Sequence, residues 1–331
     1  MLRALKDRIQ RLTSLSRTQG DAASGFPAKT ARPNQEANQE VIAAVDGFLR
    51  RERSYDKRGE IFAALVSQFA EHNPVESQVA VMFNAVLEKI VAPMHHSLFW
   101  GDRMLSLDKA AGFLEDDVFR RSYEAVRGSH IYDAYASPHT IAWRLHTLVW
   151  AARSAIAQEG DLVECGVFKG DMSWVVASVL GDKIAHRTFY LYDSFEGFSP
   201  KLSSAADFPD NPGFLKMAND IYSDPEIYQT VLKKFANMPH VKIIRGFVPD
   251  SFKIALPERI AFLHIDLNSP AAEIAALEHL FDRVVSGGYI VFDDYGWKQF
   301  QKQREAENCF MSDRGHFILE LPTGQGLVIK Q

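Results

Sequence analysis

The stretch DLVECGVFKGD, residues 161–171, decides the fold of this chain. Its apolar run, Leu162–Cys165, predicts a buried strand, and the glycines that follow predict a tight turn leading into a helix. Glycine has no Cβ, so the backbone of such a turn can approach a ligand closely. In open α/β sheets, ligands bind at the carboxyl ends of the strands, where the strand order reverses. We therefore expect Gly166 and Gly170 to line a cofactor site.

On either side of this turn, short apolar runs alternate with amphipathic segments. The predicted strands are 162–165, 188–192, 241–244, 260–265 and 289–292, and helical patterns cover 138–158, 172–180, 225–236 and 271–284. Such alternation is typical of βαβ units, which form a parallel sheet covered by helices on both faces. Residues 316–321 and 326–330 flank a turn and predict a closing hairpin. We expect a Rossmann-like α/β fold of five parallel strands plus an antiparallel hairpin, the layout of class I methyltransferases.

An acidic residue, Glu164, directly precedes the glycine turn. A carboxylate at this place would repel a bound diphosphate. The same carboxylate suits the cationic amino group and the sulfonium of S-adenosylmethionine. The negative charge of Glu164 therefore favours an S-adenosylmethionine site that includes Glu164, Gly166 and Gly170 over a site for NAD or another nucleotide.

The segment FYLYDSFEGFSP, residues 189–200, supplies further candidates for this site. Asp193 ends the second predicted strand, and an acid there can accept hydrogen bonds from both hydroxyls of a ribose. Its alternative role is to cap the segment that follows. If Asp193 holds a ribose, Ser194 and Phe195 lie near the adenine, with the Phe195 ring as a packing face.

Three aspartates follow the next two predicted strands, in the segments HIDLN (264–268) and FDDYG (292–296). Because adjacent parallel strands end at the same edge, Asp266, Asp293 and Asp294 should lie close together, where they repel one another unless a cation joins them. Oxygen ligands suit Mg²⁺ or a similar divalent ion, which would bind a substrate hydroxyl and lower its pKa. Ordinary turn formation by aspartate is the alternative. His264 shares a strand face with Asp266 and is either its buried partner or a proton acceptor.

Composition excludes several other classes of function. The chain has 331 residues, a net charge of −5 and two cysteines, Cys165 and Cys309. This charge gives no basic field for nucleic acid, and two cysteines form neither a metal motif nor a disulfide framework. No apolar run approaches the roughly 20 residues that span a bilayer. We expect a cytoplasmic protein without a transmembrane segment.

The sequence before the sheet predicts helices. Residues 1–17 form a short basic amphipathic pattern, which fits either peripheral contact with a membrane or partner, or packing on the protein itself. Residues 18–37 are rich in Gly, Ala and Pro and predict a flexible linker. Apolar stripes over 38–135 predict a helical cap or oligomerisation region, so we expect a homo-oligomer. The catalytic domain is predicted to cover 136–331, its first helix capped by Ser137 and Pro138.

With these motifs in this order, the chain resembles the macrocin O-methyltransferase (TylF/MycF/NovP-like) family over about residues 158–331. The resemblance is carried by four segments: 164–170, 193–197, Gly246-Phe247 and 287–296. It implies methylation of hydroxyls on sugars or glycosylated natural products, dependent on S-adenosylmethionine and Mg²⁺. By the same resemblance, Asp266, Asp293 and Asp294 are the metal ligands, and Asp193 holds the ribose.

The chain departs from the family pattern just after the first metal aspartate. The family usually has an Asp two residues later, followed by a Tyr-Glu-Ser/Thr run, where this chain reads Asn268-Ser269-Pro270-Ala271. Asn268 keeps an oxygen and loses the charge, so substrate contacts here should differ from those of macrolide enzymes.

The predicted function is transfer of a methyl group to a hydroxyl of a sugar, a glycosylated metabolite or a surface glycan. His264, Glu196 and a metal-bound hydroxide are alternative bases, and Asp266 takes part through the ion. Two other functions fit the same fold: an oxidoreductase that uses NAD or a nucleotide sugar, and a non-catalytic binding or scaffold protein.

Overall fold

The computed structural model describes residues 87–129 and 139–331. The predicted basic helix over 1–17, the linker over 18–37, the helical stripes before residue 87 and the cap at Ser137-Pro138 lie outside the described residues. The chain divides into two compact units, one formed by residues 1–110 and 131–140 and the other by residues 111–130 and 141–331. The segment 111–129 thus groups with the second unit, although the sequence pattern placed it with the helical region.

The described part of the first unit centres on a β-hairpin that the sequence pattern did not predict. Strands β1 (Leu98–Gly101) and β2 (Met104–Leu107) pair antiparallel, after the short helical turns Leu87–Val91 and Ala92–Met94. A Cβ on Gly101 would lie 2.4 Å from the carbonyl oxygen of His139, so only glycine fits this contact. The ring of His139 also stacks on Phe99, which closes the hairpin against residues 139–140.

The second unit is built on one seven-stranded sheet. Its order is β5-β4-β3-β6-β7-β9-β8. The strands are β3 (Asp161–Cys165), β4 (Phe189–Asp193), β5 (Val241–Arg245), β6 (Ile260–Ile265), β7 (Val284–Phe292), β8 (Leu319–Glu320) and β9 (Gly326–Ile329). The first five in chain order run parallel, whereas β9 pairs antiparallel with β7 and with β8. The prediction of five parallel strands plus a closing hairpin is confirmed.

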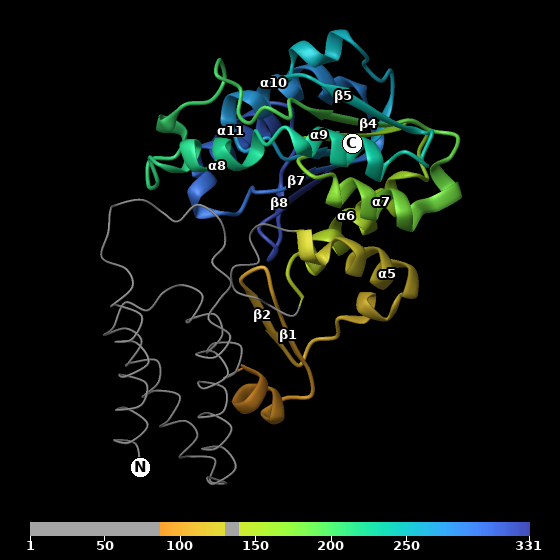
Figure 1. The fold of residues 1–331 in the computed structure, drawn as a ribbon, viewed down its shortest axis with the longest axis vertical. Helices are drawn as coiled ribbons and strands as arrows, with labels where there is room; N and C mark the ends of the chain where they lie inside the picture. Colours follow the sequence, from red (N-terminus) through yellow and green to blue (C-terminus); the bar gives the residue numbers. More distant parts are fainter. Residues whose placement is uncertain (1–86, 130–138) are drawn as a thin grey trace. The chain divides into compact units, whose positions relative to one another are not determined.

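Helices cover this sheet on both faces (Figure 1). They are α5 (Asp117–Val126), α6 (Ala142–Ala155), α7 (Asp171–Leu180), α8 (Phe214–Tyr222), α9 (Glu226–Lys234), α10 (Pro270–Leu280) and α11 (Gln301–Ser312). Short 3₁₀ turns lie at Gly112–Glu115, Arg127–Ser129, Gly181–Ile184, Ala205–Asp207, Asp250–Lys253, Phe281–Arg283 and Lys298–Phe300. Helix α7 packs with α5 and α6, and α10 packs with α11. No helix in the described ranges is long and apolar enough to cross a membrane.

Strand β6, in the middle of the sheet, has one polar side chain in an otherwise apolar core. All six residues of β6, Ile260–Ile265, are buried, and five of them are apolar. The exception is His264, which is 1% exposed. A buried imidazole must find hydrogen-bond partners within the protein, because water cannot reach it. Its partners lie at the candidate active site.

Three element boundaries differ from the sequence pattern. Helix α6 begins at Ala142 with Ile141 at the N-cap position, where no side chain caps it. The helix predicted over 271–284 ends at Leu280, and strand β7 begins at Val284 rather than at Tyr289. The early part of β7 contains glycines, which carry no apolar signal in the sequence, and its pairing with β6 is irregular there.

Candidate active site at the carboxyl edge of the sheet

The candidate site lies where the chain order of the sheet reverses, between β3 and β6. The N–H of Asp266 donates to the carbonyl of Cys165 at 2.8 Å, and the N–H of Gly166 donates to the carbonyl of Tyr192 at 2.9 Å. Gly166 has φ +89°, and a Cβ on it would lie 1.8 Å from the backbone oxygen of Asp266. Only a residue without a Cβ fits at position 166. Gly166 therefore allows the turn after β3 and the loop that carries Asp266 to lie side by side.

Asp193 holds the glycine turn through its backbone. One carboxylate oxygen accepts the N–H groups of Val167 at 2.7 Å and Phe168 at 2.8 Å, and the other accepts the N–H of Phe195 at 2.6 Å. A carboxylate has about four lone-pair positions, so one remains for a ligand hydroxyl. Asp193 ends β4 as predicted, and its contact with a ribose stays a prediction.

The other predicted cofactor residues also shape the turns. Gly170 has φ +70° at the start of α7, and a Cβ there would lie 2.8 Å from the ring of Phe235. The Ser194 hydroxyl donates to the carbonyl of Gly197 and accepts the N–H of Glu196. Phe195, with φ +54°, is buried with its ring centroid 5.0 Å from that of Tyr228. Contact of Ser194 and Phe195 with an adenine stays a prediction.

Glu164 and His264 form a buried pair across β3 and β6, where they are direct neighbours in register. The Glu164 carboxylate lies 2.8 Å from Nδ1 of His264, whose Nε2 is 3.6 Å from Asp293. Burial lowers the pKa of His264, but the neighbouring carboxylates of Asp293 and Glu164 outweigh that effect and raise the pKa to about 10. His264 thus lies between Glu164 and Asp293, and its role in the reaction stays a prediction. Glu164 is 2% exposed, so its predicted contact with the methyl donor stays a prediction.

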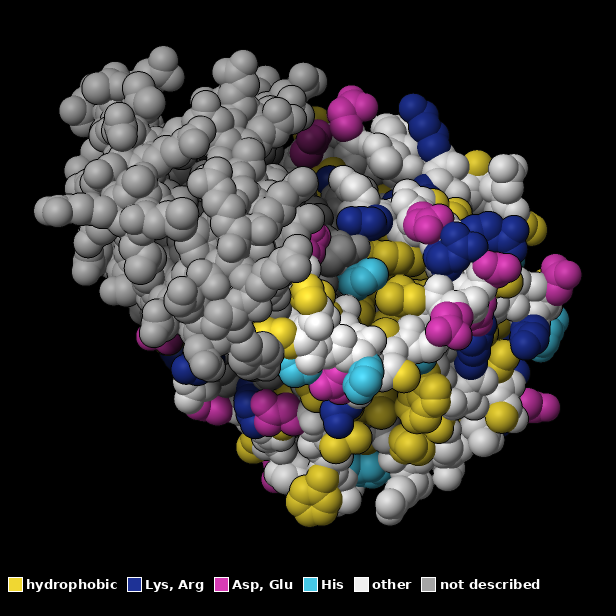
Figure 2. Space-filling view, turned by 90° about the horizontal axis from the view of Figure 1, so that it is seen from below, with side chains coloured by type: hydrophobic (Ala, Val, Ile, Leu, Met, Phe, Trp, Pro, Cys, Tyr) yellow, Lys and Arg dark blue, Asp and Glu magenta, His cyan; other side chains and the backbone are white. Residues whose placement is uncertain are grey.

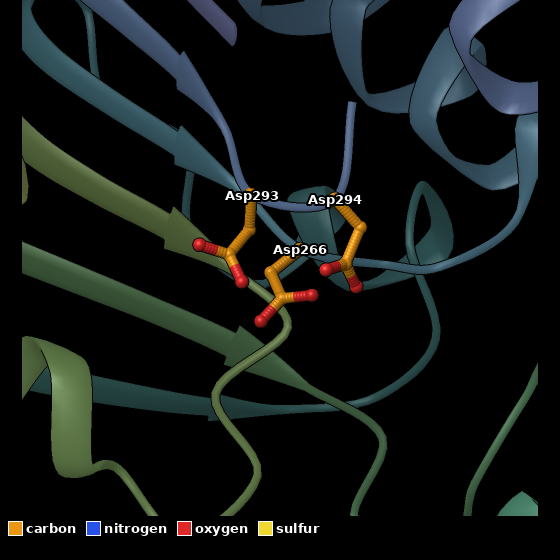
Figure 3. Close-up of side chains that lie close together, drawn as sticks. All are labelled: Asp266, Asp293 and Asp294. Carbon is orange, nitrogen blue, oxygen red and sulfur yellow. The ribbon is translucent and has the colours of Figure 1, made fainter. Parts of the chain in front are cut away.

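The three predicted metal ligands converge at this edge. Asp266 follows β6, and Asp293 and Asp294 follow β7; their carboxylates point toward one another (Figure 3). Each offers one oxygen atom, and these atoms all lie within 4.8 Å of one another. The N–H of Asp293 donates to the carbonyl of Ile265 at 3.0 Å, which fixes the strand ends relative to each other.

Three side chains that the sequence pattern did not assign to the site hold these carboxylates in place. Arg144, from the first turn of α6, donates to Asp293 at 2.6 Å and to Asp294 at 3.3 Å. The Gln325 amide donates to the second oxygen of Asp293 at 3.0 Å. The Asn268 amide donates to Asp266 at 2.9 Å. Arg144 and Gln325 lie far from Asp293 in the chain, so no local motif marks them.

Carboxyl groups crowd at this edge of the sheet. Among the described residues, Glu164, Asp266, Asp293 and Asp294 lie close to two basic side chains, Arg144 and His264. Burial, and then the neighbouring Asp293 and Asp294, raise the pKa of Asp266 well above its usual value. Burial acts the same way on Asp293, but Arg144 and His264 outweigh it and hold its pKa below the usual value. The donor set of three carboxylates fits a divalent cation with oxygen ligands.

The macrocin O-methyltransferase (TylF) family model matches residues 114–316. The chain belongs to the macrocin O-methyltransferase family. It is 30% identical over 192 residues to mycinamicin III 3''-O-methyltransferase of Micromonospora griseorubida, a match that covers 56% of this chain and 74% of that enzyme. It is 29% identical over 141 residues to demethyldecarbamoylnovobiocin O-methyltransferase of Streptomyces niveus, covering 41% of this chain and 53% of that enzyme.

One solved methyltransferase structure has the same fold as this chain. The O-methyltransferase NovP aligns with 64% of this chain and 98% of its own, with a TM-score of 0.51 and 20% sequence identity. The predicted family and the predicted class I methyltransferase fold are thus confirmed. The chain is a methyltransferase, and the alternatives of an oxidoreductase and of a non-catalytic protein are set aside.

Proposed function

We propose that this chain transfers a methyl group from S-adenosylmethionine to a hydroxyl of a sugar or glycosylated metabolite, with Mg²⁺ at the aspartate cluster. The observation that carries the proposal is the juxtaposition of the glycine turn and the three carboxylates across the contact between Gly166 and Asp266. A relative from Streptomyces olivaceus, 29% identical over 159 residues, covering 46% of this chain and 60% of that enzyme, is named an 8-demethyl-8-(2,3-dimethoxy-alpha-L-rhamnosyl)-tetracenomycin-C 4'-O-methyltransferase. Its name supports a sugar hydroxyl as the acceptor.

The glycine turn supports a methyl donor without phosphate groups. In phosphate-binding turns, free backbone N–H groups surround the anion. Here the N–H groups of Val167 and Phe168 are already bonded to the Asp193 carboxylate. That carboxylate would repel a diphosphate, but it can accept a ribose hydroxyl and favours a cationic ligand. S-adenosylmethionine has both features, a ribose and a sulfonium.

The cluster supports a metal-assisted reaction. Asp266, Asp293 and Asp294 would hold the ion, which when bound lowers the pKa of the acceptor hydroxyl. The chain's own residues keep the cluster aligned: Arg144 and Gln325 fix Asp293, and Asn268 fixes Asp266. Such fixed geometry favours direct displacement, because the hydroxyl and the methyl group must lie in line.

The two side chains predicted as alternative bases, His264 and Glu196, differ in their exposure to solvent. His264 is enclosed between Glu164 and Asp293, so it acts as a positioning residue for Asp293. Glu196 has an exposed carboxylate that bonds Arg245 at 3.0 Å, and of these two side chains it is the one that solvent reaches. Lysines and arginines lie among acidic side chains on the face seen in Figure 2, which supports a small acceptor rather than a nucleic acid.

Calorimetric titration with S-adenosylhomocysteine tests the proposal. We expect binding at about micromolar affinity, abolished in Asp193→Ala, and Mg²⁺ binding weakened in Asp266→Ala. Methyl transfer to deoxysugar glycosides should then depend on added Mg²⁺. Absence of S-adenosylhomocysteine binding at millimolar concentration would refute the cofactor, and full activity with a chelator present would refute the metal.

A further inference from the structure

Glu273, a side chain of α10, holds the backbone of the loop that carries Asp266. One oxygen of Glu273 accepts the backbone N–H groups of Leu267 and Asn268, each at 3.2 Å. Asn268 has φ +55°, and this left-handed turn directs its amide back to Asp266 at 2.9 Å. A single carboxyl oxygen thus sets the backbone on which the position of Asp266 depends.

Glu273 belongs to a buried carboxyl pair between α10 and α11. Glu273 and Glu307 are both 0% exposed, and Gln303 beside them is 1% exposed. The Gln303 amide donates to one oxygen of Glu307 at 3.0 Å. The second oxygen, Oε2, of each glutamate has no hydrogen-bond partner among the described residues.

Burial, and then the neighbouring Glu307, raise the pKa of Glu273 well above its usual value, and burial also raises the pKa of Glu307. The oxygen of Glu273 that accepts the two backbone N–H groups serves as an acceptor whether or not the other oxygen carries a proton.

We propose that Glu273 is a positioning residue: by accepting the N–H groups of Leu267 and Asn268, it fixes this backbone and thereby the position of Asp266 in the aspartate cluster. The local part of this proposal stands on contacts within the protein. Its effect on Mg²⁺ rests on the proposed function.

Two substitutions separate the acceptor role of Glu273 from its volume and charge. Glu273→Gln keeps an oxygen that can accept the two N–H groups. Glu273→Met keeps a similar length and removes this acceptor. Glu278, exposed on the same helix, provides the matched control Glu278→Met.

Hydrogen exchange of segment 266–270 and calorimetric titration with MgCl₂ supply the readouts. The amides of Leu267 and Asn268 should be protected in the wild-type protein, in Glu273→Gln and in Glu278→Met, and should exchange at least about tenfold faster in Glu273→Met. Mg²⁺ affinity should fall about 10-fold to 100-fold in Glu273→Met and stay within about twofold in the other two. Affinity for S-adenosylhomocysteine should stay unchanged in all of them.

Each outcome decides one part of the proposal. Unprotected amides at 267 and 268 in the wild-type protein overturn it even if Glu273→Met does not fold. Loss of protection in Glu273→Gln overturns it as well, because the acceptor is still present there. If the wild-type protein binds no Mg²⁺ while the exchange pattern holds, the metal proposal fails and the positioning role stands.

Discussion

The glycine turn after β3 and the aspartate cluster after β6 and β7 lie at the same edge of the sheet but are stabilised differently. In the turn, the Asp193 carboxylate accepts three backbone N–H groups, so its charge is satisfied within the protein. In the cluster, the carboxyl groups of Glu164, Asp266, Asp293 and Asp294 crowd around Arg144 and His264 among the described residues. The first region is held by neutral backbone donors, whereas the second, in the proposed function, is completed by a divalent ion.

The largest effect is expected from removing the cluster's internal cation. Arg144→Met leaves Asp293 and Asp294 buried without their guanidinium partner and should reduce the free energy of unfolding by about 3–5 kcal/mol without divalent ions. Urea unfolding measures this loss. Mg²⁺ should restore part of it, because the ion supplies positive charge at the same carboxylates.

Arg153→Met is the control for this change. Arg153 lies on the same helix and forms a more exposed pair with Asp116, so its loss should cost less than about 1 kcal/mol. Equal losses for Arg144→Met and Arg153→Met would contradict the view that Arg144 is needed to neutralise the buried aspartates.

The next effect concerns the contact that joins the two regions. Gly166→Ala adds a Cβ that would lie 1.8 Å from the Asp266 oxygen, at φ +89°. The overlap and the backbone strain should together cost about 3 kcal/mol, measured by thermal unfolding, and should weaken both S-adenosylhomocysteine and Mg²⁺ binding. Gly181→Ala, with φ +52° and nothing within 4 Å of the added Cβ, is the control for strain alone. A loss no greater than the control's would refute the role of the contact.

A smaller effect should follow from weakening the scaffold. Asp193→Asn replaces an oxygen that accepts backbone N–H groups with an amide that cannot, and it should cost about 1–3 kcal/mol of stability. Calorimetry should show weaker S-adenosylhomocysteine binding with Mg²⁺ affinity nearly unchanged. Asp210→Asn, at an exposed aspartate, controls for loss of charge. Equal weakening of both ligands by Asp193→Asn would mean that the two regions are not independent in this respect.

The smallest effect should come from adding charge to the cluster. Asn268→Asp places a carboxylate 2.9 Å from Asp266, in a backbone conformation that aspartate also adopts. Mg²⁺ affinity should rise about threefold to tenfold, and the melting temperature without the ion should fall. Asn237→Asp, at an exposed site, should change neither. Unchanged Mg²⁺ binding in Asn268→Asp would place the ion away from this carboxylate.

The sequence predicted the parts of the molecule that have a local pattern. The apolar runs gave the five parallel strands, and the strand ends gave the three aspartates. Helix α11 was missed because its buried face includes the polar Gln303 and Glu307, which hide the helical period of apolar residues. Arg144 and Gln325 were missed because their partner Asp293 lies 149 and 32 residues away in the chain. The exact partner of Glu164 was missed for the same reason, since His264 meets it only through strand register.

The separation of these partners also sets when the cluster can form as the chain folds. Arg144 and Asp293 are 149 residues apart, and Glu164 and His264 are 100 residues apart. Contacts between such distant residues cost much loop-closure entropy, so they form late, after local helices and turns. A nascent or half-folded chain therefore has scattered carboxylates and no chelating site. Capture of a divalent ion at this edge would report that the whole sheet from β3 to β7 is in place, which makes ion binding a probe of complete folding as well as of catalysis.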